Sequence, residues 1–496
     1  MVSRTAAFVI DGVDAVRVTV EADLRPGLPS FSVVGMPDRA VTEARERVRA
    51  AIANSGFEFP LRRLVVNLAP AGLRKEGPAL DLAIAGAVLA ASGQLPEGAL
   101  EDVALFAELS LDGRLQPCRG ALAAAEAARR EGTGRLVAAP ASALEASLVS
   151  GVQAVALGHL SRLAGAVGGS RHEPLPPAPP CAEGGLPDLS DVRGHALAVE
   201  ALVTAAAGGH NLLMVGPPGT GKTMLARRLS GILPPLTEAE ALEVTRIQGV
   251  AGIGPGGALT RARPFRAPHH SVSASGLVGG GTVPTPGEAT LAHRGVLFLD
   301  ELSEFSRPAL EALRVPLEEG ELTVTRGQRT VRLPASFALV AATNPCPCGR
   351  GDEGCRCTEA DLARHGRRLS GPLVDRLDLL VRVERPSSAA LAGPAGTTSE
   401  AEAERVGRAR ERQLERSGCP NALLPVGRLG EARCSAAAEA ELTRAYDAGA
   451  LSARGRDRAL RVARTIADLR GADEVAGQDV AGALAYRHDA ASSAVR

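Results

Sequence analysis

The chain reads Leu212-Leu213-Met214-Val215 and then Gly216-Pro217-Pro218-Gly219-Thr220-Gly221-Lys222-Thr223, and a helical pattern follows over residues 224–229. The apolar run is typical of a strand that is buried on both faces. The glycines after it let backbone N–H groups turn inward around an anionic phosphate, at the positive end of the following helix. In such a loop Lys222 reaches the β- and γ-phosphates, and Thr223 offers its hydroxyl to Mg²⁺. The stretch therefore predicts a strand–loop–helix unit of an α/β fold that binds a nucleoside triphosphate.

Two further apolar runs end in polar residues. Residues 296–299 are followed by Asp300-Glu301, and residues 337–342 are followed by Thr343-Asn344. A carboxylate at the end of a neighbouring strand, Asp300, can hold the Mg²⁺ shell, while Glu301 can polarise the attacking water. The amide of Asn344 can orient that water or sense the γ-phosphate. Together with the loop, these residues predict hydrolysis of the nucleotide as well as its binding.

The composition is that of a globular chain of 496 residues, long enough for roughly three domains. Lys plus Arg and Asp plus Glu both number 56, so the net charge is zero and any binding of nucleic acid must use local basic patches. Eight cysteines are too few for a disulfide scaffold, and charge, Pro or clustered Gly interrupts every long apolar run. These features predict a reduced, cytoplasmic protein without a membrane segment.

Two breaks divide the chain. Residues 168–185 are a Pro-rich linker, and residues 387–399 are a second, uncharged linker. We therefore expect an N-terminal domain over 1–167, a nucleotide-binding domain over 186–386 and a C-terminal helical domain over 400–496. In the first of these, the sequence predicts strands over 16–20, 31–34 and 64–68, a helix capped by Asp38 and a helix over 80–90.

The motifs together resemble the AAA+ ATPases of the magnesium-chelatase-like group, and among them the ComM/YifB family. The resemblance covers nearly the whole chain and rests on the phosphate loop, Asp300-Glu301, Asn344 and the run Ser370-Gly371-Pro372-Leu373-Val374-Asp375-Arg376-Leu377-Asp378. It rests also on residues 263–270, on Pro286-Gly287-Glu288 and on residues 452–454 and 461–469. The resemblance implies an AAA+ P-loop core, in which helices flank a parallel sheet, with an N-terminal Lon-protease-like α+β domain and a C-terminal helical lid. It implies ATP and Mg²⁺ as cofactors.

The same resemblance implies a homo-hexameric ring in which each ATP lies between two subunits. Arg376 then matches the arginine finger that completes the neighbour's site. The alternative is a surface salt bridge of Arg376 with Asp375 and Asp378. Arg461 or Arg454 matches the lid arginine that contacts nucleotide. The family also implies branch migration on single-stranded or branched DNA, with recombination proteins as partners, during homologous recombination in natural transformation.

The N-terminal domain departs from the protease that it resembles. Ala79, within Gly77-Pro78-Ala79-Leu80-Asp81, stands where the protease carries its nucleophilic serine, and the loop over 118–122 has no lysine. Peptide hydrolysis is therefore not expected. Lys75, one of only two lysines, is interpreted either as facing the ring opening or as a solvated loop residue. A second departure is His195, where relatives usually have glutamine near the adenine edge.

Four of the eight cysteines, Cys346, Cys348, Cys355 and Cys357, fall within 12 residues. The glycines between the two pairs allow the chain to reverse, so that four thiolates could converge on a structural Zn²⁺. The Cys-x-Cys spacing is less usual for zinc than Cys-x-x-Cys. Free thiols remain the alternative.

Residues 321–332 alternate on both sides of a Gly-containing turn and predict a β-hairpin. Arg326 and Arg329 at its tip would give a six-fold ring a positive belt that is suited to the phosphates of DNA. The alternative is an exposed hairpin without a ligand.

Two other classes of function stay open. One is a magnesium-chelatase motor subunit, against which the N-terminal domain argues. The other is a protein-remodelling ATPase, against which the low aromatic content of 2% argues.

Overall fold

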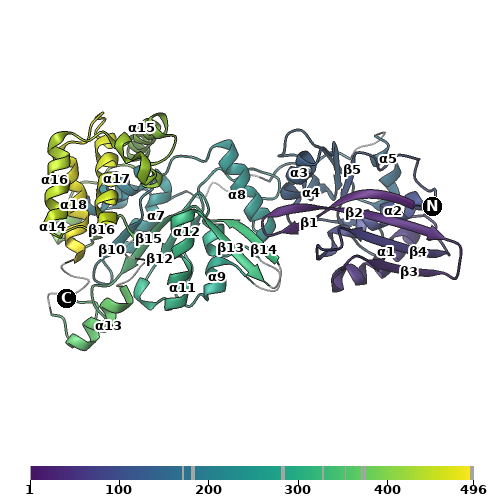
Figure 1. The fold of residues 1–496 in the computed structure, drawn as a ribbon, viewed down its shortest axis with the longest axis horizontal. Coiled ribbons are helices and arrows are strands. Elements are labelled where there is room, and N and C mark those ends of the chain that lie inside the picture. The colour runs from purple at the N-terminus through teal and green to yellow at the C-terminus, as the bar shows by residue number, and fades with distance from the viewer. Residues whose placement is uncertain are drawn as a thin grey trace.

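The structure is a computed structural model that describes residues 2–169, 173–179, 185–280, 285–326, 329–351, 354–369, 373 and 376–491. The molecule is elongated in Figure 1. The N-terminal strands and helices lie at one end, the sheet that carries the phosphate loop lies in the middle, and the C-terminal helices lie at the other end.

A seven-stranded mixed sheet organises the N-terminal part, in the order β3-β4-β2-β1-β5-β8-β9. Its long first hairpin is antiparallel, whereas β5, β8 and β9 run parallel. The seven strands are β1 (Val2–Asp11), β2 (Asp14–Arg25), β3 (Ser30–Val34), β4 (Arg63–Ala69), β5 (Val103–Phe106), β8 (Arg135–Ala138) and β9 (Gln153–Ala156). A separate small hairpin joins β6 (Glu108–Leu109) and β7 (Leu115–Gln116).

Five helices cover this sheet: α1 (Arg39–Asn54), α2 (Asp81–Ala91), α3 (Ala121–Arg130), α4 (Pro140–Ala146) and α5 (Leu163–Val167). The predicted helix after Asp38 is confirmed, because the Asp38 carboxylate accepts a 2.8 Å hydrogen bond from the backbone N–H of Val41. The apolar face of α1 is buried against the sheet. The predicted strands and the helix over 80–90 are confirmed in the same region.

The central sheet has five parallel strands in the order β11-β12-β15-β10-β16. These strands are β10 (Leu212–Val215), β11 (Phe265–Arg266), β12 (Val296–Leu299), β15 (Ala338–Thr343) and β16 (Leu379–Arg382). The helices around them are α6 (Ala196–Gly208), α7 (Lys222–Ile232), α8 (Glu238–Ala251), α9 (Ala274–Val278), α10 (Glu288–Leu291), α11 (Arg307–Ala312), α12 (Arg314–Glu319) and α13 (Glu359–Leu369). Because parallel strands share one carboxyl edge, the loops after β10, β11, β12 and β15 meet there.

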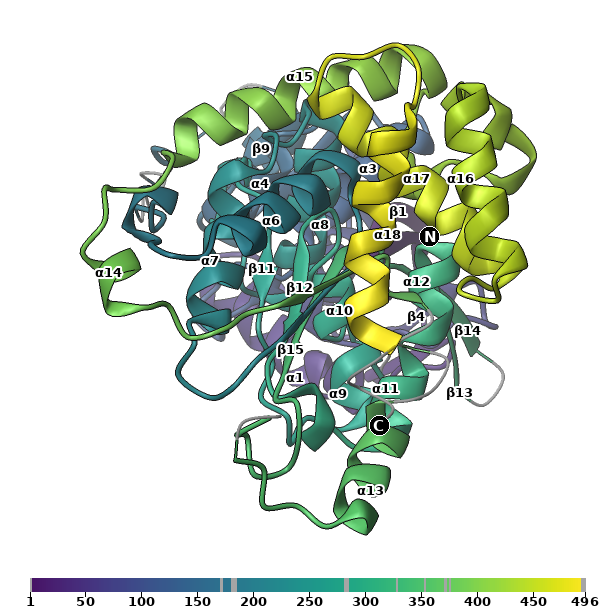
Figure 2. The same ribbon diagram turned by 90° about the vertical axis from the view of Figure 1, so that its left-hand side faces the viewer.

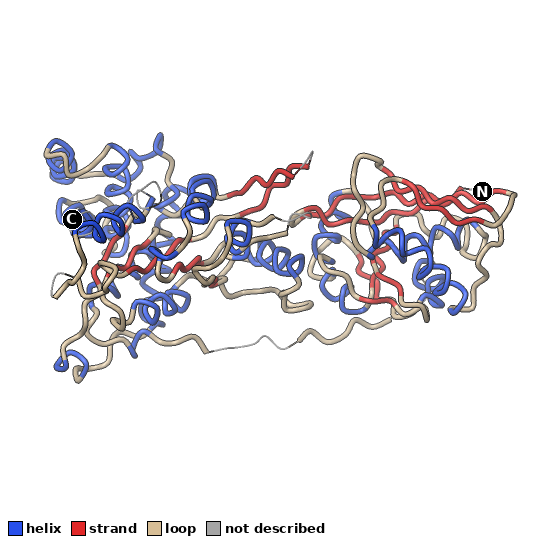
Figure 3. Tube along the Cα trace, turned by 90° about the horizontal axis from the view of Figure 1, so that it is seen from below, coloured by secondary structure: helices blue, strands red, loops and turns tan. Residues whose placement is uncertain are grey.

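The predicted hairpin over 321–332 is confirmed as β13 (Glu321–Arg326) and β14 (Arg329–Pro334), which pair antiparallel. In Figure 3 this hairpin projects from the body of the molecule. Its base is buried, since Leu322, Val331 and Leu333 belong to an apolar cluster with the central sheet.

The C-terminal part consists of α14 (Ser388–Leu391), α15 (Ser399–Ser417), α16 (Ala436–Asp447), α17 (Ala453–Leu469) and α18 (Gly477–Ala491). Figure 2 shows α15 to α18 grouped together at this end of the molecule. They share an apolar core with α6, α7 and strand β10. A fully buried polar contact supplements that core, because Nε2 of His210 lies 2.8 Å from the hydroxyl of Thr465 on α17. Among the described residues, no helix combines the length and the apolar character that crossing a bilayer requires.

The turn between β1 and β2 joins the N-terminal sheet to the central part. Val13 in this turn is 1% exposed and packs with Ile247 of α8 and with the hairpin base. Gly12 has a φ of +67°, and a Cβ there would lie 2.2 Å from a methyl group of Val331, so the close approach requires glycine. Beside the turn, Arg246 of α8 pairs with Asp14 at 2.6 Å.

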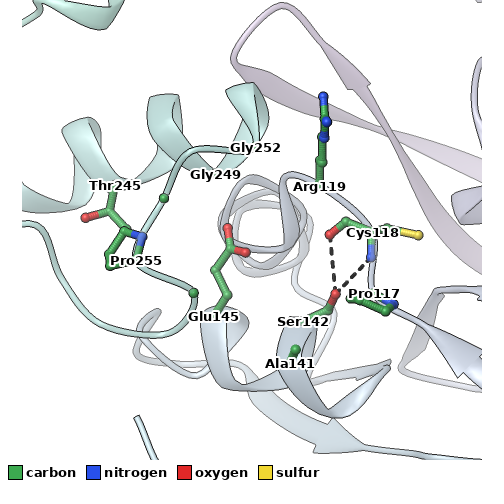
Figure 4. Close-up of a pocket in the computed structure, with 12 residues that line it drawn as sticks. Pro117, Cys118, Arg119, Ala141, Ser142, Glu145, Thr245, Gly249, Gly252 and Pro255 are labelled. Carbon is green, nitrogen blue, oxygen red and sulfur yellow. Dashed lines mark hydrogen bonds between the residues drawn. The ribbon is translucent and has the colours of Figure 1, made fainter. Parts of the chain in front are cut away.

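A cavity of about 270 Å³ lies at the same junction, between the loop around Cys118 and the segment after α8 (Figure 4). Ser142 exchanges hydrogen bonds with the backbone of Cys118 on its wall, at 3.1 and 3.3 Å.

Candidate active site

The phosphate loop connects β10 to α7 at the carboxyl edge of the central sheet. Gly219 and Gly221 adopt left-handed backbone conformations, with φ of +77° and +88°, which turn the chain into the first turn of α7. Gly216 is required for another reason, because a Cβ there would lie 2.0 Å from the carbonyl oxygen of Val383. The loop therefore has the backbone conformation that a ring of inward N–H donors needs.

Lys222 begins α7, and its side chain is buried beneath the loop. Its Nζ donates hydrogen bonds to the carbonyl oxygens of Gly216 at 2.5 Å and Pro217 at 2.8 Å, and to Oδ1 of Asn344 at 3.3 Å. Burial lowers the pKa of this ammonium, and the carboxylates of Asp300 and Glu301 oppose that shift. The cation thus lies within the field of both acidic residues.

The hydroxyl of Thr223 donates a 2.6 Å hydrogen bond to Oδ2 of Asp300. These are the two residues that the sequence assigns to Mg²⁺. A hydroxyl and a carboxylate are hard oxygen donors of the kind that Mg²⁺ prefers, so the residues fit the ion. Glu301 follows in a left-handed conformation, with φ of +53°, and its side chain is 57% exposed.

Asn344 follows β15, the neighbour of β10 in the sheet. Its backbone oxygen lies 3.0 Å from Nε2 of His365, a buried residue on α13. The structure therefore brings Lys222, Thr223, Asp300 and Asn344 into one network. His195 also lies beside the loop, where its Nε2 is 3.7 Å from the position of a Cβ on Gly221.

Arg376 lies outside that network in its own chain. Its guanidinium donates to Glu318 of α12, a carboxylate that is half exposed, and its backbone oxygen accepts a 3.1 Å hydrogen bond from Asn211. Glu318 is thus one partner of Arg376. The predicted alternative, a salt bridge with Asp375 and Asp378, stays a prediction, because Asp375 lies outside the described residues.

Both candidate lid arginines lie on α17. Arg454 is exposed in the first turn, whereas Arg461 is partly buried and donates a 2.9 Å hydrogen bond to the carbonyl oxygen of Leu424. Sequence reasoning missed Arg458 on the same helix, whose Nε lies 3.8 Å from Oδ1 of Asp378. In a chain with so many arginines, no local signal distinguishes this one.

The four cysteine sulfurs converge after Asn344, each within 4.8 Å of the others. Sγ–Sγ distances of 3.4, 3.7 and 3.8 Å are close to the ~3.8 Å edge of a tetrahedron with Zn–S bonds of about 2.3 Å. Backbone N–H groups of Gly351 and Cys348 point at sulfurs of Cys346 and Cys357, both at 3.4 Å. A Cβ on Gly349 would lie 2.8 Å from Pro218, so the cysteine loop packs against the phosphate loop.

The candidate DNA residues Arg326 and Arg329 face each other across the end of the hairpin in its backbone register. Their side chains lie outside the part that the structure describes, as do residues 327 and 328.

In the N-terminal domain, the structure describes both Ala79 and Lys75, which the sequence singled out. Ala79 lies in a 3₁₀ turn after Gly77. Both interpretations of Lys75 are wrong, because its side chain is 0% exposed and its ammonium donates to the carbonyl oxygen of Pro70. Burial lowers the pKa of this lysine.

His270 belongs to the run 263–270 on which the resemblance rests, but its contact with Glu301 was not predicted: Nδ1 of His270 lies 3.3 Å from Oε2 of Glu301. The sequence signal that could have indicated this contact is the position of His270 just after a short strand, Phe265–Arg266, whose carboxyl end lies at the same sheet edge as the other site residues.

Three family models match successive parts of the chain. They are described as magnesium chelatase, subunit ChlI (residues 188–391), subunit ChlI of Mg-chelatase (residues 20–142) and the C-terminal part of magnesium chelatase subunit ChlI (residues 396–487). An uncharacterized protein of Mycobacterium tuberculosis is 44% identical over 98% of this chain and 99% of its own length. The YifB protein of Salmonella typhimurium is 44% identical, and the competence protein ComM of Haemophilus influenzae is 43% identical, each over 96% of this chain and 95% of its own.

Proposed function

Because the chain belongs to the YifB/ComM family of magnesium-chelatase-like AAA+ ATPases, we propose that it is a hexameric ring motor that hydrolyses ATP to drive branch migration of DNA. The observation that carries the ATPase part is the network of Lys222, Thr223, Asp300 and Asn344 at one sheet edge. A loop that binds phosphate, two magnesium donors and a polar residue at the neighbouring strand end are what nucleotide hydrolysis requires.

In the proposed mechanism, different residues bind the phosphates, bind Mg²⁺ and activate the attacking water. The loop backbone and Lys222 hold the phosphates, and Thr223 and Asp300 hold Mg²⁺, which neutralises charge on the phosphates when it is bound. Glu301 accepts a proton from the attacking water, and Asn344 orients that water. Lys222 exchanges its contacts with the Gly216 and Pro217 carbonyl oxygens for phosphate oxygens.

Arg376 completes the neighbouring subunit's site in this proposal. In the single chain its side chain is 7% exposed and pairs with Glu318, which is half exposed, so in this role Arg376 exchanges Glu318 for the nucleotide of a docked neighbour. Either Arg454 or Arg461 contacts the nucleotide from the lid. A planar guanidinium suits the charge that develops on the transferred phosphoryl group.

The DNA part of the proposal rests on the hairpin and on the relative named competence protein ComM. The hairpin projects from the body, and Arg326 and Arg329 at its end would contact phosphates without reading sequence. Single-stranded or branched DNA is the proposed substrate, in homologous recombination during natural transformation. Recombination proteins are the proposed partners, and the cytoplasm is the proposed location.

A branch-migration assay tests this function. Purified protein with ATP should convert a labelled three-strand or Holliday junction into products, and Glu301→Gln protein should not. A parental protein whose ATPase is active but indifferent to DNA would contradict the DNA substrate. Stimulation by a porphyrin-inserting partner or by an unfolded polypeptide would instead favour the chelatase-motor or the protein-remodelling alternative.

We also propose that Cys346, Cys348, Cys355 and Cys357 hold a structural Zn²⁺. The convergence of the four sulfurs and the two N–H groups that point at them support this ion. Metal analysis of protein purified without chelator should find about one zinc per chain. Less than about 0.2 zinc per chain would contradict it.

A further inference from the structure

Glu145 of α4 extends into the cavity at the junction of the N-terminal and nucleotide-binding domains (Figure 4). Its Oε1 accepts a 3.2 Å hydrogen bond from the backbone N–H of Leu122, at the start of α3. On the opposite wall, a Cβ at Gly249 of α8 would lie 2.4 Å from the same oxygen, so the carboxylate reaches across to the nucleotide-binding domain. The cavity therefore holds a carboxylate that both domains contact.

This carboxylate has no cationic partner in the part of the chain that the structure describes. Burial raises the pKa of Glu145, and the N–H of Leu122 opposes the shift. Arg119, the basic residue on the wall, is exposed and lies against Gly252, where its Nε is 2.6 Å from the position of a Cβ. A carboxylate that is withdrawn from water is stabilised most by a partner that carries positive charge.

The hydroxyl groups on the wall already have partners. Ser142 exchanges hydrogen bonds with the backbone of Cys118. The hydroxyl of Thr245 donates to the carbonyl oxygen of Ala241 at 2.7 Å and accepts from the N–H of Thr260 at 2.9 Å. Among the described side chains of the wall, the carboxylate of Glu145 is therefore the charged acceptor that remains for a ligand.

The end of helix α8 adds negative potential to the same cavity. The helix ends at its C-cap, Gly252, and both Gly249 and Gly252 line the cavity. The carbonyl groups at the C-terminus of a helix form the negative end of its dipole, which favours cations. The helix end and the carboxylate of Glu145 thus favour a ligand of the same charge.

The size and lining of the cavity favour an organic cation over a metal ion. A volume of about 270 Å³ is much larger than a single ion needs, and among the described residues only the four cysteines converge as a metal-binding group. Pro117, Ala141 and Pro255 give the wall an apolar part. An aliphatic chain can pack against these residues while its charged end reaches Glu145.

We propose that this cavity binds a small organic cation, an ammonium or guanidinium group on an aliphatic stem, whose charged end pairs with Oε2 of Glu145. The ligand contacts α4 and the loop around Cys118 from one domain and the end of α8 from the other. Its binding therefore stabilises the docked arrangement of the two domains. The cavity is separate from the phosphate site, and the proposal does not rest on ATP hydrolysis.

Isothermal titration calorimetry of the full chain with putrescine and with agmatine, in the absence of nucleotide and DNA, tests the proposal. Both amines should bind, whereas n-butanol, which has a similar stem without the charge, should not. Glu145→Gln should weaken binding about 10- to 100-fold, because a charge-assisted hydrogen bond is lost while the side chain keeps its size. Glu131→Gln, at an exposed glutamate of the same domain, is the matched control and should bind as the parent does.

Two further variants test the cavity itself. Ala141→Phe, at an exposed position on the wall, should fill the space and abolish binding, and its temperature of unfolding without ligand reports whether the fold is kept. Arg119→Ala should bind at least as tightly as the parent, because a neighbouring positive charge is removed.

Absence of saturable binding of either amine at about 10 mM would overturn the proposal. Parental affinity in Glu145→Gln or in folded Ala141→Phe protein would also overturn it. A loss of about tenfold or more in Arg119→Ala would show that the cavity selects an anion, which contradicts the proposed class of ligand.

Discussion

The hydroxyl of Thr223 and the carboxylate of Asp300 are joined by a 2.6 Å hydrogen bond, although 77 residues separate them in the chain. One follows β10 and the other follows β12, with β15 between these strands in the sheet. The hydrogen bond therefore connects the ends of two strands on either side of β15, the strand that Asn344 follows. This placement defines a site whose parts can be tested one by one.

Lys222→Ala should abolish ATP hydrolysis and weaken ATP binding. The ammonium is the only lysine at the site, and loss of one charged donor to the transferring group lowers rates by roughly 10²–10³-fold. Binding of a fluorescent ATP analogue and phosphate release would measure the two effects. Arg227→Ala, an exposed cation on the same helix, is the control and should keep parental values.

Glu301→Gln should retain ATP binding and lose hydrolysis by about 10²–10⁴-fold, because an amide cannot accept the proton of the attacking water. Single-turnover hydrolysis with prebound ATP separates the two steps. Glu304→Gln, an exposed glutamate three residues on, should hydrolyse at the parental rate. Equal rates for Glu301→Gln and the parent would remove Glu301 from the mechanism.

Arg376→Ala should lower hydrolysis by about 10³-fold or more if it acts in trans. Mixing it with inactive Lys222→Ala protein should then restore part of the activity, because a Lys222→Ala subunit still offers Arg376 to the intact phosphate loop of its neighbour. Hydrolysis by the mixture, after subunit exchange has been verified, is the measurement. A mixture as inactive as its two components would argue that Arg376 does not reach a neighbour.

Cys346→Ser should lower metal content, the temperature of unfolding and kcat together. Cys346 is buried and lies two residues after Asn344, and the cysteine loop packs against Pro218 of the phosphate loop. Loss of the metal should therefore displace both Asn344 and the phosphate loop. The expected loss in kcat is about tenfold or more, similar to the loss of residues that support metal sites. Cys419→Ser, at a cysteine outside the cluster, should change none of the three quantities.

The local parts of the site could be predicted from the sequence. A phosphate loop is a contiguous motif, and Asp300 and Asn344 each follow an apolar run whose strand character is evident, so the parallel sheet alone brings them together. The hairpin over 321–332 was likewise predictable, because alternation and its turn are short-range features.

The long-range contacts could not be predicted. Strand β11 has only two residues, which is too short for a periodic signal, and so its pairing with β12 and the approach of His270 to Glu301 were missed. The pairing of Arg376 with Glu318 depends on how α12 packs. Lys75 was interpreted wrongly because a Gly- and Pro-containing loop suggests exposure, whereas the fold buries the side chain against Pro70.

Through Val13, the turn between β1 and β2 packs into the apolar core of the nucleotide-binding part. Its side chain fills space between α8 and the hairpin base, and the backbone of Gly12 rests on Val331. A fragment that starts after the Pro-rich segment would keep every residue of the phosphate site. It would lose the Val13 side chain, and apolar surface on α8 would then be exposed to solvent. Cutting the chain at the linker should therefore give a fragment with the complete phosphate site and an uncovered apolar face.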